Sequence, residues 1–563
     1  MTGPGTRRER IRRLSSERFD VLVIGGGITG AGVALEAAAR GLSVALIEQG
    51  DFAEGTSSRS TKLVHGGLRY LPMLDIAQVR EDLEERDALL RNAPHLVRPL
   101  PFVLPLYAGS RRPLGLRLPP VLRAALPLGM AGGLWLYDVL AGRRGVRRHR
   151  SLTPAAAASL VPPLRLAGLR RAYVYYDAVT DDARLVIAVL RTALGRGAVA
   201  GNYVRAAGLL MERGRVAGAR AVDLLTGENL RVSARTTVNA TGVWADSVAA
   251  LGGRPTFTIR RSKGVHLVLP GDRLRLGRAA LVLPETDDGR LAFVVPWFGT
   301  ALVGTTDTEW EGPPDPPRVE GRDVDYLLDH ASRYLTARLT PNDVLGVYAG
   351  LRPLVGTGAG VNRPGARLSR RHEIVQSTEG LVTVVGGKLT TYRKMAEDVV
   401  RVICGPPPRG VSPTRGLALE GAPGLTDALP RVRSRALRLG LPGRTCVHLL
   451  RSYGTGAAAV LELVAARPSL GEPLAPGRPH IAAEVIVAVR EEMAHTVGDV
   501  LLRRTRLAHF LPRHGREIAA RVAALMAEDL GWTPEAQAGE VARFERDAAS
   551  LAPFDGRPSE RTP

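Results

Sequence analysis

The stretch from Phe19 to Glu48, FDVLVIGGGITGAGVALEAAARGLSVALIE, constrains the fold more than any other part of the chain. An apolar run rich in β-branched residues leads into three glycines, a helical pattern and a second apolar run that ends in an acid. This is the order of a β–α–β unit. In such a unit the glycine turn lets the main chain approach a pyrophosphate, and the helix N-terminus supplies N–H groups and a positive dipole end. The sequence therefore predicts a Rossmann-like α/β domain that binds a dinucleotide.

Five residues of this unit have distinct expected roles. Gly25 permits the tight turn, Gly27 allows close approach of a phosphate, and Gly30 lets the helix pack against the strand. Ile28 begins the helix, and Glu48 is expected to accept hydrogen bonds from ribose hydroxyls. Because an acid at this position disfavours a 2′-phosphate, FAD or NAD is expected rather than NADP. A glycine turn without a ligand is the alternative.

Length, cysteine content and charge set wider bounds. A chain of 563 residues predicts two or three domains. Two cysteines without metal-ligand spacing indicate a reducing cytoplasm rather than a disulfide framework. The basic residues 1–18 contain no apolar segment, so we interpret them as a mobile arm and not as a secretory signal. The formal net charge of +22 suits nucleic acid, anionic lipid or small phosphorylated substrates. Nucleic acid is the weakest of these, since no nucleic-acid-binding motif is found.

A loop rich in Gly, Ser and Thr follows Glu48 over residues 50–71. Loops of this length inside a compact domain usually serve function, and its position directly after the ribose acid predicts that it runs along the cofactor. An ordinary surface loop is the alternative. The residues expected to contact the cofactor are Ser58, Ser60, Thr61, Lys62, Leu63, His65 and Gly66.

Two later segments are expected to reach the same ligand. TTVNATGVWAD (236–246) predicts a strand, a glycine turn and a helix, and residues 379–398 repeat that order around Gly386 and Gly387. Lys388 would place a positive charge near the flavin N1 and C2 carbonyl and stabilise the reduced ring. A purely structural turn is the alternative. The other residues expected at the cofactor here are Val204, Ala240, Gly242, Trp244, Leu389 and Thr390.

Residues 111–150 hold nine arginines against one acid, Asp138. An apolar run with Trp135 and Tyr137 lies among them, but proline and glycines interrupt it, so it is a poor bilayer-spanning helix. Two interpretations stay open: peripheral contact with an anionic membrane surface, or a core helix with solvated arginines.

The rest of the chain divides by pattern. Residues 74–92 predict an amphipathic scaffold helix, and residues 260–308 predict an antiparallel sheet. After Cys404 a Pro-rich linker leads into helical patterns, including a long one over 480–510. The last residues are expected to be disordered.

Several long motifs in fixed order resemble the FAD-dependent, quinone-linked glycerol-3-phosphate dehydrogenase family. They are GGGITGAG, TSSRSTKLVHGGLRYL, DDARL, NATGVWAD, KGVHLVLP, VGTTDTE, GLRPL and GGKLTTYRKMAED. The resemblance implies a glutathione-reductase-type FAD-binding domain, an antiparallel-sheet substrate domain and an all-α C-terminal domain. The expected ranges are 19–72, 150–255 and 346–403 for the FAD domain, 73–149 and 256–345 for the substrate domain, 404–548 for the helical domain, and 1–18 and 549–563 for the arm and tail.

The family's activity would be oxidation of sn-glycerol 3-phosphate to dihydroxyacetone phosphate, with electrons passing from FAD to a membrane quinone. It implies a cytoplasmic enzyme attached peripherally to the inner face of the cell membrane. The oligomeric state stays open, with a homodimer as one option. By the same resemblance Arg69, Tyr70, Arg352 and Lys388 would line the substrate site, and His266 would lie near the reacting carbon.

Chemistry independently favours these residue types. A phosphate dianion suits an arginine fork and a lysine point charge. His266 is by base rate a sheet histidine, but with a pKa near its unperturbed value it could take the hydroxyl proton; Arg352 could instead polarise the hydroxyl. Three alternatives remain: an oxidase that passes electrons to oxygen, an amino-acid or hydroxy-acid oxidase of the same fold, and a non-catalytic flavoprotein.

Overall fold

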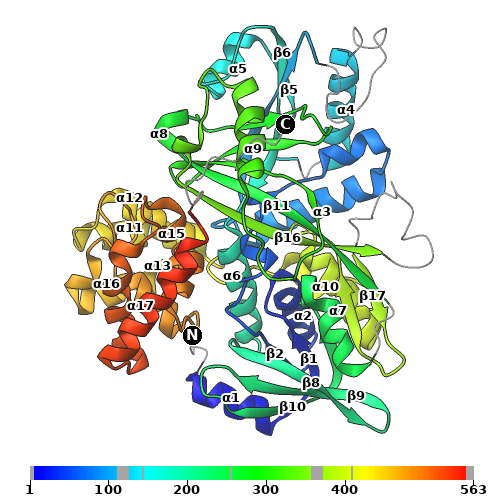
Figure 1. Ribbon diagram of the computed structural model, residues 1–563, viewed down its shortest axis with the longest axis vertical. Helices are drawn as coiled ribbons and strands as arrows, with labels where there is room; N and C mark the ends of the chain where they lie inside the picture. Colours follow the sequence, from blue (N-terminus) through cyan, green and yellow to red (C-terminus); the bar gives the residue numbers. More distant parts are fainter. Residues whose placement is uncertain are drawn as a thin grey trace.

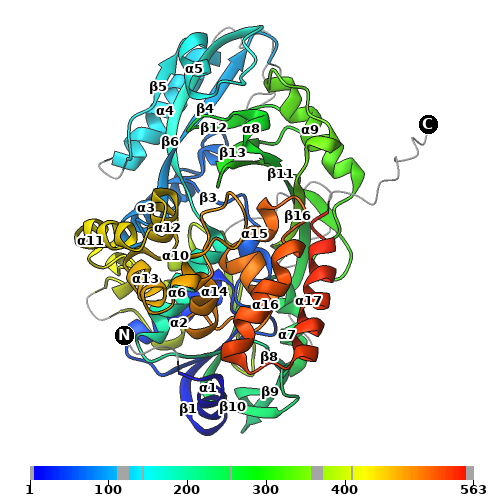
Figure 2. The ribbon, with the colours of Figure 1, turned by 90° about the vertical axis from the view of Figure 1, so that its left-hand side faces the viewer.

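The computed structural model describes residues 5–110, 126–142, 145–253, 257–356, 372–407 and 410–552. Two sheets with their covering helices form the body of the molecule, and a helical C-terminal part packs beside them (Figure 1, Figure 2).

The first sheet has eight strands and contains the predicted β–α–β unit. Its central strand β1 (Arg18–Ile24) pairs in parallel with β2 (Val44–Ile47) and β10 (Asn229–Asn239). Outer strands extend this core on both sides. They are β7 (Val199–Gly201), β8 (Val204–Glu212), β9 (Arg215–Asp223), β17 (Glu373–Gln376) and β18 (Val382–Val385).

Helices α2 (Ile28–Ala39), α6 (Asp182–Leu194) and α10 (Tyr392–Cys404) cover one face of this sheet and share one apolar core with it. Asp181 is the N-cap of α6, as the sequence predicts, and accepts the N–H of Arg184 at 3.2 Å. The β8–β9 hairpin and α1 (Arg7–Ser16) cover the other face.

The interpretation of residues 1–18 as a mobile arm was wrong for this helix. Ile11 and Leu14 of α1 are buried against the sheet, and Arg7 pairs with Asp223 at 2.7 Å. Ile11 and Leu14 have the spacing of neighbours on one face of a helix, but the surrounding basic residues made this pattern hard to recognise. Two buried side chains are enough to dock a short helix on an apolar face.

The second sheet has ten strands and is mixed. Most neighbours are antiparallel, as predicted, but β12 pairs in parallel with β4. The strands are β3 (Leu63–Val64), β4 (Arg98–Tyr107), β5 (Arg150–Leu152), β6 (Leu169–Val179), β11 (Thr258–Pro270), β12 (Ala280–Leu283), β13 (Ala292–Trp297), β14 (Thr300–Gly304), β15 (Thr308–Trp310) and β16 (Gly346–Gly356).

The expected ranges differ from the structure at strands β3, β5, β6 and β16. The sequence places all four in the cofactor domain, β3 in 19–72 and the others at the beginnings of 150–255 and 346–403, but they pair within the second sheet. Side-chain patterning shows that a segment is a strand without showing its partner, so these boundaries could not be read from it.

Helices α5 (Pro154–Leu160), α8 (Gly271–Leu274) and α9 (Gly321–Tyr334) pack on one side of the second sheet. The predicted scaffold helix is α3 (Ile76–Asn92), which packs on the other side with α4 (Leu126–Ala141). Helix α4 lies in the arginine-rich region, of which residues 111–125 and 143–144 lie outside the described residues. Among the described residues no helix is long and apolar enough to cross a membrane.

The C-terminal part is helical, as predicted, and has its own apolar core. Its main helices are α11 (Leu425–Arg438), α12 (Gly443–Tyr453), α13 (Ala457–Ala466), α14 (Ala483–Arg490), α15 (Leu507–Phe510), α16 (Arg516–Leu530) and α17 (Pro534–Ala549). The long helical pattern over 480–510 is broken: α14 ends at Arg490, and a π-helical turn, Asp499–Arg504, precedes α15.

The expected disordered tail begins too early. Leu551 is buried, and its carbonyl accepts the N–H of Val347 at 2.9 Å. The remainder of the predicted tail, residues 553–563, lies outside the described residues.

Candidate active site

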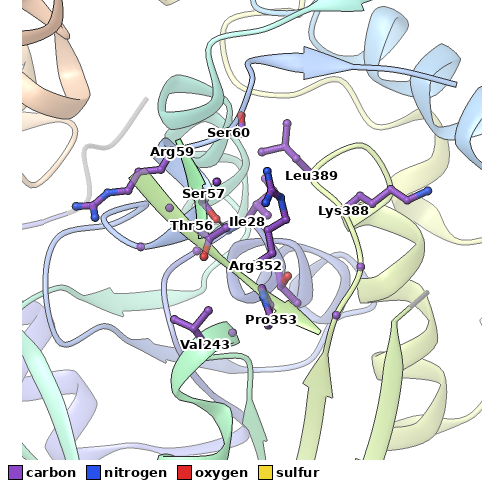
Figure 3. Close-up of a pocket in the computed structure, with 18 of the residues that line it drawn as sticks. Ile28, Thr56, Ser57, Arg59, Ser60, Val243, Arg352, Pro353, Lys388 and Leu389 are labelled. Atoms are coloured by element: carbon purple, nitrogen blue, oxygen red, sulfur yellow. Dashed lines mark hydrogen bonds between the residues drawn. The ribbon is translucent and has the colours of Figure 1, made fainter. Parts of the chain in front are cut away.

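One cavity of about 610 Å³ lies where the two sheets meet. Gly27 of the first glycine turn and Gly387 of the second both line it, together with Arg352 and His266 from the second sheet. Residues that are hundreds of positions apart in the sequence therefore share one chamber (Figure 3).

The first glycine turn is tightly fitted to its neighbours. Gly25 has a φ of +112°, and a Cβ there would lie 2.7 Å from the carbonyl oxygen of Ala240. A Cβ at Gly30 would overlap the carbonyl oxygen of Gly25, so α2 can pack this close only with glycine at that position. At the beginning of α2, the Ser57 hydroxyl accepts the N–H of Ile28 at 2.9 Å.

Glu48 ends β2 beside this turn. Its carboxylate accepts the N–H of Gly26 at 2.6 Å and that of Gly50 at 2.9 Å. Burial raises the pKa of Glu48 to about 7, although both N–H groups oppose that shift. Its main-chain carbonyl accepts the N–H of Val204 at 2.7 Å, so the predicted ribose and adenine residues are adjacent.

Twenty of the predicted site residues line the cavity. They are Gly25, Gly27, Ile28, Glu48, Ser60, Thr61, Leu63, His65, Arg69, Tyr70, Val204, Ala240, Gly242, Trp244, His266, Arg352, Gly387, Lys388, Leu389 and Thr390. Four predicted residues do not line it: Gly30, Ser58, Lys62 and Gly66.

Of the four residues that do not line the cavity, Ser58, Lys62 and Gly66 form hydrogen bonds behind its wall. The Lys62 ammonium is buried against Asp182 at 2.7 Å and also donates to the carbonyl of Ser58. Asp182 further accepts from the Ser60 hydroxyl at 2.7 Å, so this ion pair holds the loop that lines the cavity. The N–H of Gly66 donates to the buried Asp177 at 3.0 Å.

The second glycine turn depends on a side chain from α3. Lys388 is ion-paired with the fully buried Asp82, with Nζ–Oδ2 at 2.6 Å, and its ammonium lies 4.3 Å from the ring centroid of Tyr70. Burial raises the pKa of Asp82 to about 6, although Lys388 opposes the shift. Figure 3 shows the Lys388 side chain extending away from the cavity.

Arg352 lies on β16 and points across the cavity toward Ser60 and Leu389 (Figure 3). Its guanidinium donates to the Thr305 hydroxyl at 2.9 Å and lies 3.3 Å from Asp307 Oδ1. A quarter of its side chain is exposed.

His266 is buried on β11, where its ring stacks on Tyr348 with centroids 4.8 Å apart. Nε2 lies 2.9 Å from the Thr61 hydroxyl, and Nδ1 has no hydrogen-bond partner among the described residues. Burial lowers the pKa of His266 well below its ordinary value, and the charges of Arg352 and Lys62 add to the shift. The expectation of a nearly unperturbed pKa was therefore wrong, because the imidazole is enclosed beside two cations.

Some lining residues were missed by sequence reasoning. Thr56, Ser57 and Arg59 belong to the predicted loop and line the cavity, but the alternating hydroxyls gave no reason to prefer one over the next. Asp82 was assigned to a scaffold helix, and nothing in the sequence links it to Lys388, 306 positions away.

An apolar wall closes the cavity on the side of the second sheet. Phe102 stacks on Tyr175 at 5.3 Å and meets Phe293 edge-on at 6.1 Å. Val282 and Leu291 complete this wall. The chamber is thus polar along the glycine turns and apolar opposite them.

Two family models match this chain. Residues 20–393 match the FAD dependent oxidoreductase family, and residues 412–537 match the C-terminal domain of alpha-glycerophosphate oxidase. Glycerol-3-phosphate dehydrogenase of Mycobacterium leprae is 40% identical over 547 residues, which is 96% of this chain and 90% of that protein. The chain belongs to the FAD-dependent glycerol-3-phosphate dehydrogenase family.

Further members of this dehydrogenase family agree. The human mitochondrial glycerol-3-phosphate dehydrogenase is 37% identical over 553 residues, covering 94% of this chain and 73% of that protein. The solved glycerol-3-phosphate dehydrogenase of Bacillus halodurans, complexed with FAD, matches with a TM-score of 0.79 and 30% identity over the whole of both chains. An α-glycerophosphate oxidase structure from Mycoplasma pneumoniae (TM-score 0.52, 17% identity, 69% of this chain and 95% of that one) shares the fold.

The residues present fit FAD. The cradle at Gly25 and Gly30 has no room for a Cβ, and the N-cap of α2 is Gly27, with no acid in the first turn. Ser57 is the neutral side chain that accepts an N–H there, so no negative charge competes with a pyrophosphate for the positive end of the helix. Glu48, Val204 and the second glycine turn all line the same chamber.

Proposed function

We propose that this enzyme oxidises sn-glycerol 3-phosphate to dihydroxyacetone phosphate, with hydride transfer to FAD and delivery of the electrons to a membrane quinone. One observation carries the proposal. The two glycine turns that would hold FAD open into the same cavity as a cluster of cations and a histidine from the second sheet.

The cations suit a phosphate dianion. Arg69, Arg352 and Lys388 all line the cavity, and the guanidinium of Arg352 points into it. Because an arginine fork can bind two phosphate oxygens at once, Arg352 is the natural anchor, and Arg69 adds charge at the wall. The ammonium of Lys388 is paired with Asp82 and acts by holding the second glycine turn. The net charge of +22 would also draw anionic substrates toward the protein.

His266 is the residue that supports proton removal. FAD, when bound, accepts the hydride from the carbon that bears the hydroxyl. The hydroxyl proton must then pass to a base. A histidine with a lowered pKa is neutral and so carries a lone pair, although the same shift makes it a weaker base. Its Nδ1 is buried and has no hydrogen-bond partner among the described residues, so this nitrogen can accept a proton in the tautomer that has its N–H at Nε2.

The apolar wall supports a quinone as electron acceptor. Phe102, Tyr175 and Phe293 present aromatic rings to the chamber, which suits a planar, weakly polar molecule. Relatives with 37–40% identity are dehydrogenases, whereas the likeness to the oxidase structure is one of fold.

Helix α4 supports peripheral contact with a membrane. Met130, Leu134 and Tyr137 face the core, while Leu128, Trp135 and Val139 form a stripe on the opposite face and are 52–78% exposed. Nearby arginines, Arg147, Arg148 and Arg150, are exposed too. An apolar stripe beside exposed cations is typical of a surface that binds anionic lipid.

The substrate is tested by anaerobic titration of the yellow protein with glycerol 3-phosphate. The flavin absorbance band at about 450 nm should bleach. Glycerol, amino acids and hydroxy acids should leave it unchanged. Bleaching by an amino acid or a hydroxy acid, but not by the phosphoester, would reject the proposal.

The acceptor and the phosphate anchor need separate measurements. Turnover followed with a soluble quinone and, in parallel, with an oxygen electrode should show quinone reduction and little oxygen uptake. Arg352→Ala should lower kcat/KM by about 1000-fold, since it removes a charged anchor. Arg322→Ala, at an exposed arginine of α9, is the matched control and should change nothing.

Membrane contact is tested by co-sedimentation with vesicles. The protein should bind vesicles containing anionic lipid and release them at high salt, and Leu128→Glu with Trp135→Glu should abolish binding. Equal sedimentation of the double variant would remove α4 from the contact surface.

A further inference from the structure

The loop that carries the ribose acid has two faces. Glu48, Gly50 and Glu54 line the cavity, whereas the residues between them, Asp51 and Phe52, are fully buried on the side away from it. This loop of residues 48–55 therefore lies between the cofactor chamber and whatever packs behind it.

The buried residues of the loop fix the first glycine turn. Phe52 packs on Gly26, where a Cβ would lie 2.6 Å from its ring, and the Ala53 N–H donates to the carbonyl of Gly26 at 3.1 Å. Ala53 has a φ of +67°, a left-handed conformation that alanine adopts only when its surroundings impose it. Contacts from outside the 48–55 loop must therefore hold Ala53 in this conformation.

The helical C-terminal part supplies it at Asp51. Arg503 Nε lies 2.5 Å from Asp51 Oδ2, and Arg504 binds both carboxylate oxygens, at 2.7 and 2.9 Å. Both arginines lie on the π-helical turn Asp499–Arg504 and are buried. A bidentate arginine fixes the orientation of a carboxylate as well as its distance.

The arginines are themselves fixed. Asp499 accepts from Arg503 at 2.7 Å and from the Tyr203 hydroxyl at 2.7 Å, and the Glu492 carbonyl accepts from Arg504 at 2.7 Å. The carboxylate of Glu492 also lies 3.7 Å from Arg504 Nε, so Asp51, Asp499 and Glu492 together surround the two guanidiniums inside the interface. Burial alone would raise the pKa of Asp51, but Arg504 and Arg503 outweigh it and lower that pKa to about 2, so the carboxylate stays charged.

We propose that the helical C-terminal part is a cofactor clamp: Arg503 and Arg504 hold Asp51 and thereby keep the 48–55 loop and the first glycine turn in the conformation that binds FAD. Asp51, Arg503 and Arg504 are positioning residues, since none of them lines the cavity. The clamp concerns FAD alone, so it does not depend on which substrate the enzyme oxidises.

Hydrogen exchange on the unmodified protein tests the clamp. Binding free energies are reciprocal, so if the clamp favours FAD binding, FAD must stabilise the clamp. Amides of residues 499–505 should exchange about tenfold more slowly with FAD than in the apoprotein, while those of α16 should change by less than about twofold. Equal exchange of residues 499–505 in both forms would overturn the proposal.

Asp51→Asn tests the same link through affinity. Flavin titration of the apoprotein should give a Kd for FAD about tenfold higher than the wild-type value. The control is Glu420→Gln, which breaks the ion pair between the helical part and Arg191 of α6, away from the 48–55 loop. Its Kd should stay within about twofold. An equal loss in both variants would show general docking instead of a clamp, and an unchanged Kd in folded Asp51→Asn would exclude it.

Asp51→Asn leaves two arginines buried without their carboxylate and could fail to fold. Arg503→Lys then serves in its place, because lysine keeps the charge but cannot reach both Asp51 and Asp499 in a fixed fork. A rise in Kd of about threefold is expected, and a wild-type Kd would overturn the clamp.

Discussion

The two glycine turns that line the cavity are held in different ways. The first is fixed by main-chain fit: Gly25 and Gly30 pack where no Cβ fits, and the N–H of Gly26 is bonded to Glu48. The second is fixed by a charge, because Lys388 extends from it to Asp82 on a helix of the other sheet. The first turn is therefore shaped by close main-chain packing within its own sheet, with the helical part holding the loop behind it, whereas the second exists in its present form only when the two sheets are assembled.

This difference predicts separate consequences for binding and for turnover. Damage to the first turn should release the cofactor, whereas damage to the second should leave the cofactor in place and change its reactivity. The following changes are ordered from the largest expected effect to the smallest.

Gly30→Ala should abolish FAD binding. The new methyl group would overlap the carbonyl oxygen of Gly25, so α2 must move away from the turn. The purified variant should retain less than about a tenth of its flavin, measured as the ratio of absorbance at the flavin and protein bands. Gly539→Ala on α17, where a Cβ meets no atom, is the control and should bind FAD normally. Full flavin content in Gly30→Ala would contradict the main-chain account of the first turn.

Lys388→Ala should keep FAD and lose turnover. Lys388 lies on the turn that lines the cavity, and its ammonium holds that turn to Asp82, so its loss should displace the turn beside the expected flavin and lower kcat by about 100-fold. Steady-state kinetics together with flavin content distinguish the two effects. Lys394→Ala, six residues along in α10 and paired with Glu397 and Asp398, should behave as wild type. Normal turnover would remove Lys388 from the site.

Asp82→Asn should have a smaller effect of the same kind. Asparagine has nearly the same shape but cannot pair with the ammonium, so Lys388 would be less well oriented, and a fall of about tenfold in kcat is expected. Asp87→Asn, on the same helix and paired with Arg91, is the control. Affinity for sulfite, which adds to flavins beside a positive charge, gives a readout besides turnover; an unchanged sulfite affinity would count against positioning.

Glu48 provides the smallest effect, on the pH dependence of stability. Its pKa in the folded protein is about 7, above the ordinary value of 4.5. Between those values the unfolded chain has lost a proton that the folded protein keeps, so apoprotein stability should fall as pH rises from about 4.5 to about 7. Glu48→Gln should remove this pH dependence. The free energy of unfolding that the wild type loses over this range is on the order of 1 kcal/mol, after allowance for the partial exposure of Glu48. Thermal unfolding of both apoproteins at pH 5 and pH 8 measures it; parallel curves would contradict the shift.

The same contrast explains what the sequence could predict. The β1–α2–β2 unit was predicted correctly because each of its features is local: strand periodicity, glycines at fixed spacing and an acid at the strand end. Helix α3 and the antiparallel pairs β11–β14 and β13–β14 also follow from side-chain patterning. Long-range facts did not follow, because patterning does not report partners: the parallel β4–β12 pair, the membership of β6 in the second sheet, and the docking of α1.

Within the site the same limit holds. Most of the predicted glycines and loop residues line the cavity, whereas Lys62 does not, because its partner Asp182 lies 120 positions away. The pKa of His266 depends on burial and on two cations brought together by folding, so its ordinary value was the wrong starting point.

Strand β6 and helix α6 have a mechanical consequence. The strand places Asp177 under Gly66, and the following residues, Asp181 and Asp182, reach Arg506 of the helical part and Lys62 of the loop. One short segment of chain thus connects the second sheet, the helical part and the cofactor loop beside the chamber. A rigid-body rotation of one sheet against the other would break these hydrogen bonds and ion pairs. We therefore expect entry and exit of small molecules to rely on movement of short surface loops.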